Sequence, residues 1–395
     1  MKKLITLVLT VLLLSLVLVS CGGDKKSDAS SDEKVITVGV YEPSSGANGA
    51  GGKKEILGIE YAASLYPTVT IGGEEYKVEL AIVDNQSEND KGVSAAQELV
   101  SEKASIVIGS YGSGVAMAAA PTFDKAKIAA IGASCTNPGV TLGNPYYFRI
   151  CYLDPFQGSV LANLAVDEFD AKKAYVFTEQ GDDYSVGLGK YFVTEFEKLG
   201  GTVVEDQNTA GNTDMSGFVN KAVSENVDVI FAPSSTTVAS LLIAQAASAG
   251  IPIISADTWD DAVILEAATK SGAQVFFSTF YDSEASKEAK EFLAGFQSWL
   301  GANAGKLKDN GGSDTVSAVS ALGYDAYLVA LEAIKAADST NSDKIATALS
   351  SVKYSGVTGE VVFDSEGDVD KNIIFIKTVD TENGVFKSVK EQGVK

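Results

Sequence analysis

The stretch Ile106-Val107-Ile108-Gly109-Ser110-Tyr111-Gly112-Ser113-Gly114 decides the fold. Its three β-branched residues predict a short buried strand, and the glycines that follow them predict a loop. Apolar residues at helical spacing, from Ala116 to Phe123, then predict a helix. Units of strand, loop and helix build a parallel sheet that is covered by helices on both faces. Ser113 is therefore expected where a helix begins, just beyond the end of a strand.

The same unit recurs in two series along the chain. We expect strands of the first series at residues 35–40, 68–71, 76–83, 106–108 and 128–131, with Gly72-Gly73 forming a hairpin turn. We expect strands of the second series at residues 174–177, 202–204, 227–231, 251–254 and 275–280, with helices between them. Residues 286–300 and 316–337 are helical again, and residues 360–363 and 372–379 are β-like. Two series predict two doubly wound α/β lobes, joined by a connector at residues 148–155.

The composition excludes several classes of function. The chain of 395 residues has 52 acidic residues, 31 basic residues and no histidine, which gives a formal net charge of −21. Without histidine it can form no Ser-His-Asp or Cys-His catalytic site, and no zinc or haem site with a histidine ligand. The acidic balance argues against a nucleic-acid partner, which would need basic patches. We expect no cofactor and no metal, and no spacing singles out a catalytic carboxylate pair or lysine.

The N-terminus indicates export. A basic start, Met1-Lys2-Lys3, precedes a run of sixteen mostly apolar residues that is shorter than the roughly 20 needed to span a bilayer. The run ends in Leu18-Val19-Ser20-Cys21, which resembles the lipobox of bacterial lipoproteins. The resemblance implies a signal peptide at residues 1–20, a lipid on Cys21 and a solvated tether at residues 21–34. The protein would lie on the outer face of the cell membrane, facing the periplasm where an outer membrane exists. An uncleaved anchor helix is the alternative.

Short motifs along the exported part resemble those of one family, in the same order. They are Ile36–Val40 with Ser44-Ser45-Gly46, Val83–Ser87, Val107–Gly114, Gly132–Pro138, Phe148-Arg149 with Phe156-Gln157-Gly158, and Ala256–Trp259. Together they resemble the branched-chain amino-acid type of extracellular solute-binding protein, the ligand receptor of certain ABC importers. The resemblance implies the type I periplasmic-binding-protein fold, in which hinge strands join two Rossmann-like lobes that close over a ligand in the interlobe cleft. It implies a first lobe of residues 35–152 and 284–354 and a second lobe of residues 153–283 and 355–395.

The resemblance also implies a site for an amino acid between hydroxyl groups and a carboxylate. Ser113, Ser134 and Thr136 match positions that bind the ligand's carboxylate beside helix N-termini, which favour an anion. Ser113 and Thr136 are otherwise plain helix caps. Asp257 matches the acid that binds the ligand's ammonium group, often a glutamate in this family, and is otherwise a helix cap or a solvated loop acid. Tyr184 matches a tyrosine that packs on the ligand from the second lobe.

Further candidate ligand-binding residues surround these positions: Ser45, Tyr111, Cys135, Ser235 and Trp259. Tyr111 and Trp259 would wall the side-chain pocket, although core packing explains such aromatic residues equally well. Tyr281 is a further candidate. Arg149 is the only arginine in the chain. Its place at the crossover favours a structural ion pair over a contact with the ligand.

These observations predict a protein that binds its ligand without transforming it. We expect it to capture an amino acid, with an aliphatic side chain as the first expectation, and to deliver it as a monomer to an ABC permease and its ATPase subunits. A component that presents its ligand to a separate sensory receptor is the alternative, and an exported enzyme is a further one. Because export permits a disulfide, Cys135 and Cys151 are left open as a disulfide or two free thiols.

Overall fold

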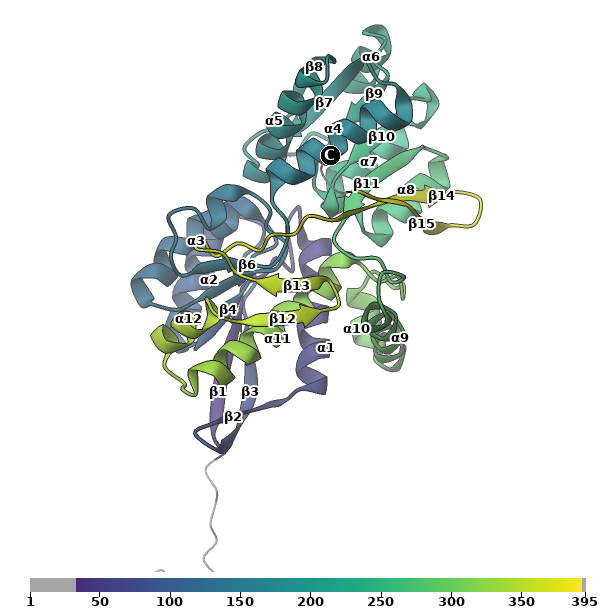
Figure 1. Ribbon diagram of the computed structural model, residues 1–395. Helices are drawn as coiled ribbons and strands as arrows, with labels where there is room; N and C mark the ends of the chain where they lie inside the picture. The colour runs from purple at the N-terminus through teal and green to yellow at the C-terminus, as the bar shows by residue number, and fades with distance from the viewer. Residues whose placement is uncertain (1–32, 393–395) are drawn as a thin grey trace, which may run out of the picture. The chain divides into compact units, whose positions relative to one another are not determined.

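The computed structural model describes residues 33–392, and the expected signal peptide and Cys21 lie outside them (Figure 1). The chain forms a first sheet in the order β2 (Thr68–Ile71), β3 (Glu74–Ile82), β1 (Val35–Val40), β4 (Ile106–Ile108), β5 (Ala130–Gly132) and β6 (Tyr147–Arg149). All neighbouring strands of this sheet are parallel except β2 and β3, which form the hairpin expected at Gly72-Gly73.

The second sheet repeats this architecture. Its order is β15 (Val385–Gln392), β14 (Ile374–Asp380), β11 (Val275–Thr279), β10 (Ile253–Ser255), β9 (Val229–Phe231), β7 (Lys173–Glu179) and β8 (Thr202–Asn208). The strands from β11 to β8 are parallel, whereas β14 pairs antiparallel with both β11 and β15. The expected α/β fold with two parallel-sheet lobes is therefore confirmed.

Helices cover both sheets. Those on the side of the first sheet are α1 (Gly49–Leu65), α2 (Asn89–Ser101), α3 (Ser113–Ala126) and η1 (Pro138–Val140), together with α11 (Ala318–Ala337) and α12 (Ser342–Leu349) from later in the chain. Two further helices, α9 (Lys287–Ala302) and α10 (Ala304–Asp309), pack against α1. Those packed with the second sheet are α4 (Asp154–Phe169), α5 (Asp183–Lys198), α6 (Ser216–Ser224), α7 (Thr236–Ala246), η2 (Ala247–Ala249), η3 (Asp257–Trp259) and α8 (Ala262–Ser271). Among the described residues, no helix is both long and apolar enough to cross a membrane.

Helices α1 and α11 form a close contact in the first lobe. A Cβ atom on Gly58 would lie 1.9 Å from the carbonyl oxygen of Ser320, and one on Gly323 would lie 2.3 Å from that of Glu55. Only glycine lets the two backbones approach this closely. A late segment of the chain is thereby packed against its first helix.

A small hairpin, β12 (Lys353–Gly356) and β13 (Gly359–Val362), lies beside α11. The backbone N–H groups of Val357 and Thr358 donate to the buried carboxylate of Asp325 on α11, at 3.0 and 2.8 Å. The lobe boundary expected at residue 354 falls inside this hairpin.

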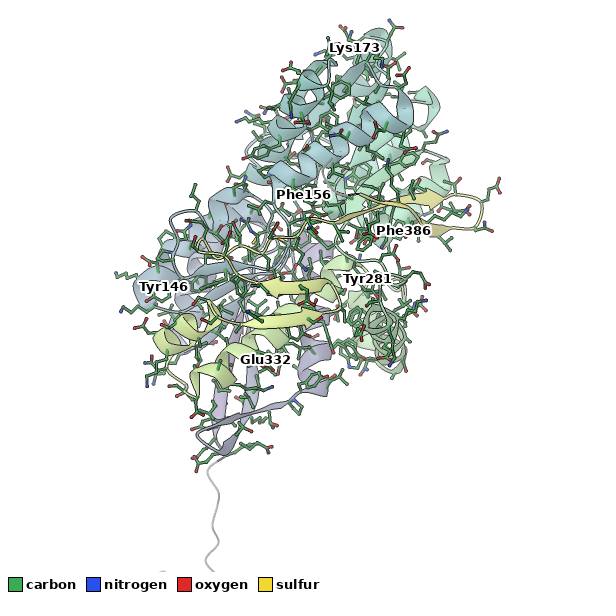
Figure 2. The ribbon with its side chains drawn as sticks, in the orientation of Figure 1. Tyr146, Phe156, Lys173, Tyr281, Glu332 and Phe386 are labelled. Carbon is green, nitrogen blue, oxygen red and sulfur yellow. The ribbon has the colours of Figure 1, made fainter. Side chains whose placement is uncertain are left out.

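The chain passes between the two sheets after β6, after β11 and before β14, and Figure 1 shows the last of these passages in yellow. Tyr152 and Phe280 pack where the first two passages meet, with ring centroids 4.2 Å apart. Tyr152 also contacts Phe156, which Figure 2 labels between the two sheets. These aromatic contacts join the first two passages.

The buried Arg149 confirms the predicted structural ion pair. Its guanidinium donates to the carboxylate of Asp368 in the last passage, at 2.7 and 2.9 Å, and to the carbonyl oxygen of Cys135 at 3.0 Å. Cys135 and Cys151 are buried free thiols. The question left open by the sequence is thereby answered in favour of two thiols.

The connector predicted at residues 148–155 is shorter than expected. Phe148 and Arg149 belong to β6, and Asp154 and Pro155 already begin α4. Proline is favoured in the first turn of a helix, because the N–H that it lacks has no partner there. The Asp-Pro pair was thus a helix start, and α4 was absent from the expected elements.

Candidate functional site

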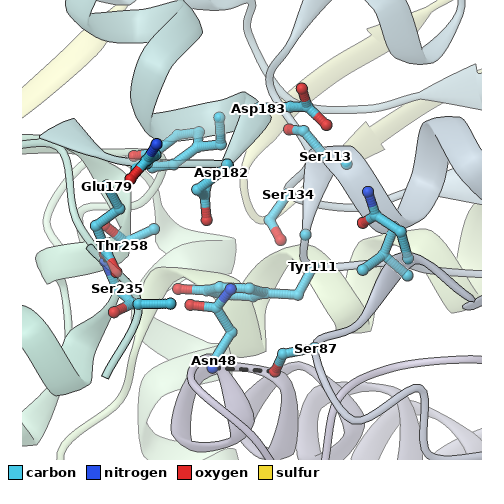
Figure 3. Close-up of a pocket in the computed structure, with 18 of the residues that line it drawn as sticks. Asn48, Ser87, Tyr111, Ser113, Ser134, Glu179, Asp182, Asp183, Ser235 and Thr258 are labelled. Carbon is cyan, nitrogen blue, oxygen red and sulfur yellow. Dashed lines mark hydrogen bonds between the residues drawn. The ribbon is translucent and has the colours of Figure 1, made fainter. Parts of the chain in front are cut away.

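A cavity of about 180 Å³ lies between the carboxyl ends of the strands of both lobes (Figure 3). This volume equals that of about six water molecules at about 30 Å³ each, so the cavity suits a small metabolite. The first lobe contributes Asn48, Ser87, Asn89, Tyr111, Gly112, Ser113, Gly114, Val115 and Ser134. The second contributes Glu179, Gln180, Gly181, Asp182, Asp183, Tyr184, Asn208, Ala210, Ser235, Asp257 and Thr258.

The first-lobe wall presents hydrogen-bond donors. Ser113 is the first residue of α3, and Gly112 before it supplies no side-chain cap. The N–H groups of the first helical turn have no carbonyl partner within the helix, and the helix dipole adds partial positive charge there. The Ser113 hydroxyl accepts a bond from the N–H of Asn137 at 3.3 Å, which leaves its own proton for a ligand. This wall can therefore bind a carboxylate.

The second-lobe wall presents Asp257, the first residue of η3 after β10. Its side chain is 3% exposed and accepts hydrogen bonds from Gln157 Nε2 at 2.6 Å and from the Tyr184 hydroxyl at 2.9 Å. Burial raises the pKa of Asp257 to about 6. These two donors hold the carboxylate in place, and a ligand cation would complete its partners.

A pair of buried carboxyl groups lies behind the first-lobe wall. Glu55 on α1 accepts a hydrogen bond from the Ser134 hydroxyl, and Glu42 after β1 accepts one from the N–H of Tyr111 at 2.6 Å. Burial raises the pKa of both carboxyl groups, to about 7 for Glu55, and the charge of Glu55 raises the pKa of Glu42 further. Because the Ser134 hydroxyl donates its hydrogen bond to Glu55, it can act toward a ligand chiefly as an acceptor.

Direct contacts join the two lobes around the cavity. Lys54 on α1 forms a buried ion pair with Asp261, which precedes α8. Away from this pair, the Thr237 hydroxyl donates to the carbonyl oxygen of Ala47 at 3.1 Å, and Asn137 Nδ2 donates to that of Asp183 at 3.1 Å. The lobes are thus closed over the cavity.

The structure brings six of the ten expected ligand-binding residues to the cavity wall: Tyr111, Ser113, Ser134, Tyr184, Ser235 and Asp257. Figure 3 shows Ser113 and Ser134 opposite Ser235, with the ring of Tyr111 extending between the two walls. All six lie in segments that follow a strand, as the sequence predicts.

The other four expected residues do not line this cavity: Ser45, Cys135, Thr136 and Trp259. The Ser45 hydroxyl is exposed and donates to Asp84 at 2.7 Å. Cys135 and Thr136 are fully buried, and the Cys135 sulfur lies so near Gly132 that a Cβ there would approach it to 2.3 Å. Trp259 is fully buried in the core of the second lobe. Tyr281 also points elsewhere, because its hydroxyl donates to the carbonyl oxygen of Ala289.

Several wall residues had no place among the sequence-based candidates: Asn48, Ser87, Asn89, Glu179, Asp182, Asn208 and Thr258. Glu179 ends β7, Asn208 ends β8, and Asp182 precedes α5. They hold the same strand-end positions as Ser113 and Asp257. That shared position is the signal by which they could have been found.

Comparison with known proteins agrees with this architecture. A family model described as periplasmic binding protein matches residues 35–382. An amino acid binding protein of Pseudomonas aeruginosa is 32% identical over 200 residues, which are 50% of this chain and 53% of that protein. The match thus spans about half the length of that relative.

Two solved structures cover nearly the whole described chain. A leucine binding protein from Thermotoga maritima is 31% identical with a TM-score of 0.82, over 91% of this chain and 99% of that one. A branched-chain amino acid transporter substrate binding protein from Streptococcus pneumoniae, in complex with isoleucine, is 27% identical with a TM-score of 0.80, over 92% of this chain and 100% of that one. The likeness extends to the arrangement of both lobes.

Proposed function

The chain belongs to the periplasmic binding protein family, and from this premise we propose that it captures an amino acid between its lobes and delivers it to an ABC permease. The observation that carries the proposal is the opposition of two groups across one cavity. The uncapped N-terminus of α3 with Ser113 suits a carboxylate, and the buried Asp257 suits an ammonium group. An α-amino acid carries both groups on one carbon atom.

Binding and closure are coupled in this proposal. The ligand's carboxylate first binds the first-lobe wall, and closure then brings Asp257 and Tyr184 onto its ammonium group. Because the full set of contacts exists only in the closed form, the ligand shifts the open–closed equilibrium toward closure. The closed form docks on the permease, where separate ATPase subunits drive import. The ligand leaves chemically unchanged, since its recognition uses only hydrogen bonds and ion pairs.

The location and the division of the chain form part of the same proposal. Residues 1–20 act as a signal peptide, and a lipid on Cys21 anchors a monomer to the outer face of the membrane. The first lobe comprises residues 35–152 and 284–354, and the second comprises residues 153–283 and 355–395. Labelling with a radioactive fatty acid tests the anchor: the unchanged chain incorporates label and Cys21→Ser does not. Equal labelling of both would contradict it.

Isothermal titration of the purified chain against each of the twenty amino acids tests the capture of an amino acid. We expect saturable binding of at least one of them with a 1:1 stoichiometry, and mass spectrometry should recover the ligand unaltered. Failure of all twenty to bind would contradict the amino-acid ligand. Conversion of the ligand during incubation would instead favour an enzyme.

A further inference from the structure

The cavity wall carries more carboxylates than an aliphatic amino acid has positive charges. The wall includes four of them: Glu179, Asp182, Asp183 and Asp257. An aliphatic amino acid is a zwitterion, which brings one ammonium group for Asp257 and one carboxylate for the N-terminus of α3. Asp183 lies at the N-terminus of α3, where a Cβ on Gly114 would approach its Oδ2 to 2.7 Å. The ligand therefore leaves Glu179 and Asp182 without a counter-charge.

The protein itself does not supply that counter-charge. Among the described residues that line the cavity, none is lysine or arginine. The buried cations Lys54 and Arg149 are held in ion pairs with Asp261 and Asp368. The electrostatic field in the cavity is thus negative on the second-lobe side, and a cation would be attracted there.

Glu179 and Asp182 face the cavity only partly solvated. Burial raises the pKa of both carboxyl groups, because the loss of water disfavours their charged forms. Backbone N–H groups offset part of this loss: that of Ser185 donates to Asp182 at 2.9 Å, and that of Ser235 donates to Glu179. A ligand cation between the two carboxylates would offset the rest.

The cavity offers little surface for an aliphatic side chain. Beside its aromatic residues and glycines, the apolar side chains on its wall are those of Val115 and Ala210. The remaining wall carries amides and hydroxyls, including those of Asn48, Asn208 and Thr258. A leucine side chain placed among them would remove water from these groups without replacing its hydrogen bonds, which is costly.

Tyr111 provides an independent sign of a polar ligand. Its side chain is 7% exposed, it lines the cavity, and its hydroxyl makes no hydrogen bond to any described residue. A Cβ atom on Gly51 would lie 2.5 Å from the Tyr111 ring, so the glycine at this position makes room for the ring. Figure 3 shows the ring extending from the first-lobe wall toward Ser235. The ring face can hold a cation and its free hydroxyl can accept a hydrogen bond.

Resting on the proposed function, we propose that the ligand is an amino acid whose side chain carries a second positive charge, an ammonium or guanidinium group. Its α-carboxylate lies at Ser113 and its α-ammonium at Asp257. The side-chain cation lies over Tyr111 and pairs with Glu179 and Asp182. The second lobe then contributes three carboxylates, those of Glu179, Asp182 and Asp257, and closure brings them onto the two cationic groups of the ligand.

Titration calorimetry of the full chain with L-lysine, L-ornithine, L-arginine, L-leucine, L-isoleucine and L-glutamine tests this inference. We expect one of the three cationic amino acids to bind about 100-fold more tightly than leucine or isoleucine. Tightest binding of leucine, isoleucine or glutamine would overturn the inference and leave the proposed function standing. Failure of every amino acid to bind would instead contradict the proposed function.

A variant locates the second cation. Glu179→Gln keeps an oxygen for the N–H of Ser235 but removes the charge, so it should weaken the cationic amino acid about tenfold and leave leucine unaffected. Glu205→Gln is the matched control, because it removes the same charge from an exposed position on neighbouring β8 and should change nothing. Should Glu179→Gln fail to fold, Asp182→Asn keeps an oxygen for the N–H of Ser185 but removes the charge, and it should weaken the same ligand about tenfold. Unchanged affinity in the folded variant would remove its carboxylate from the site.

Discussion

The two walls of the cavity are built from the same strand–loop–helix unit and yet carry opposite chemistry. In the first lobe, α3 begins without a side-chain cap, so its N–H groups remain for a ligand. In the second lobe, Asp182 caps α5 and Ser235 caps α7. There the protein's own oxygens occupy the helix N-termini, and the carboxylates of Glu179 and Asp257 dominate the wall. The presence or absence of a cap thus decides which end of a zwitterion each lobe receives.

Removing the charge of the second wall should have the largest effect. Asp257→Asn keeps the shape of the side chain but leaves a buried ligand ammonium without a counter-charge, so affinity should fall about 100-fold or more. Calorimetry with the amino acid that binds the unchanged protein most tightly measures this loss. Asp170→Asn is the control, because this exposed side chain pairs with Lys172 at the surface. Equal affinity of Asp257→Asn and the unchanged protein would place the ammonium elsewhere.

The contact between the walls ranks second. Lys54→Met leaves Asp261 buried without its cation and weakens the closed form, so dissociation of the ligand should be about 30-fold faster while association changes little. Stopped-flow fluorescence measures both rate constants. Lys53→Met, one residue earlier on the same helix, should leave dissociation unchanged. Slower association with unaltered dissociation would show that the ion pair acts on the open form instead.

The contrast between the walls also separates what sequence can predict from what it cannot. The two strand-and-helix series, Ser113 and Asp257 were predictable, because parallel strands bring the residues that follow them to one edge. Thr136 and Trp259 also follow strands, but they are buried away from the cavity. Which residue of a loop faces the cavity depends on backbone torsions that the pattern of residue types does not encode.

Long-range pairs lie further beyond sequence reasoning. Lys54 and Asp261 are more than 200 residues apart and meet only when both lobes are folded. In the sequence, nothing distinguishes Glu179 from other acidic residues at strand ends, because the cavity that it lines is formed only together with the opposite wall. The fold follows from local periodicity, whereas the charge balance of the site follows from three-dimensional neighbours.

Removing a hydrogen-bond donor from the first wall should lower the ligand affinity less than removing the acid from the second wall. Ser113→Ala deletes one hydroxyl, but the N–H groups of the α3 terminus remain, so affinity should fall about tenfold. Calorimetry against the same amino acid gives the value. Ser45→Ala, whose hydroxyl is bonded to Asp84 away from the cavity, should bind like the unchanged protein. A loss at Ser45 as large as that at Ser113 would mean that the carboxylate lies outside this cavity.

Lowering the pH should weaken the binding of the ligand's ammonium group by the second wall. With a pKa of about 6, Asp257 is about 90% ionised at pH 7 and about 10% ionised at pH 5, so affinity should fall nearly tenfold over this interval. Calorimetry across this range checks the slope, which Asp257→Asn should flatten. A profile that is flat in the unchanged protein would show that the acid keeps its charge throughout.

The stability of the ligand-free protein should respond to the same titration with the opposite sign. In the folded state burial raises the pKa of Asp257 to about 6, of Glu55 to about 7 and of Asp154 to about 8, above their ordinary values of 3.8, 4.5 and 3.8. The folded state therefore binds protons more tightly, and this stabilisation is complete below those ordinary values and is lost as the pH rises toward 8. The melting temperature of the ligand-free chain should be lower at pH 8 than at pH 5.5, and Glu55→Gln should reduce the difference. Because affinity rises over the range in which stability falls, the ligand should raise the melting temperature more at pH 7 than at pH 5.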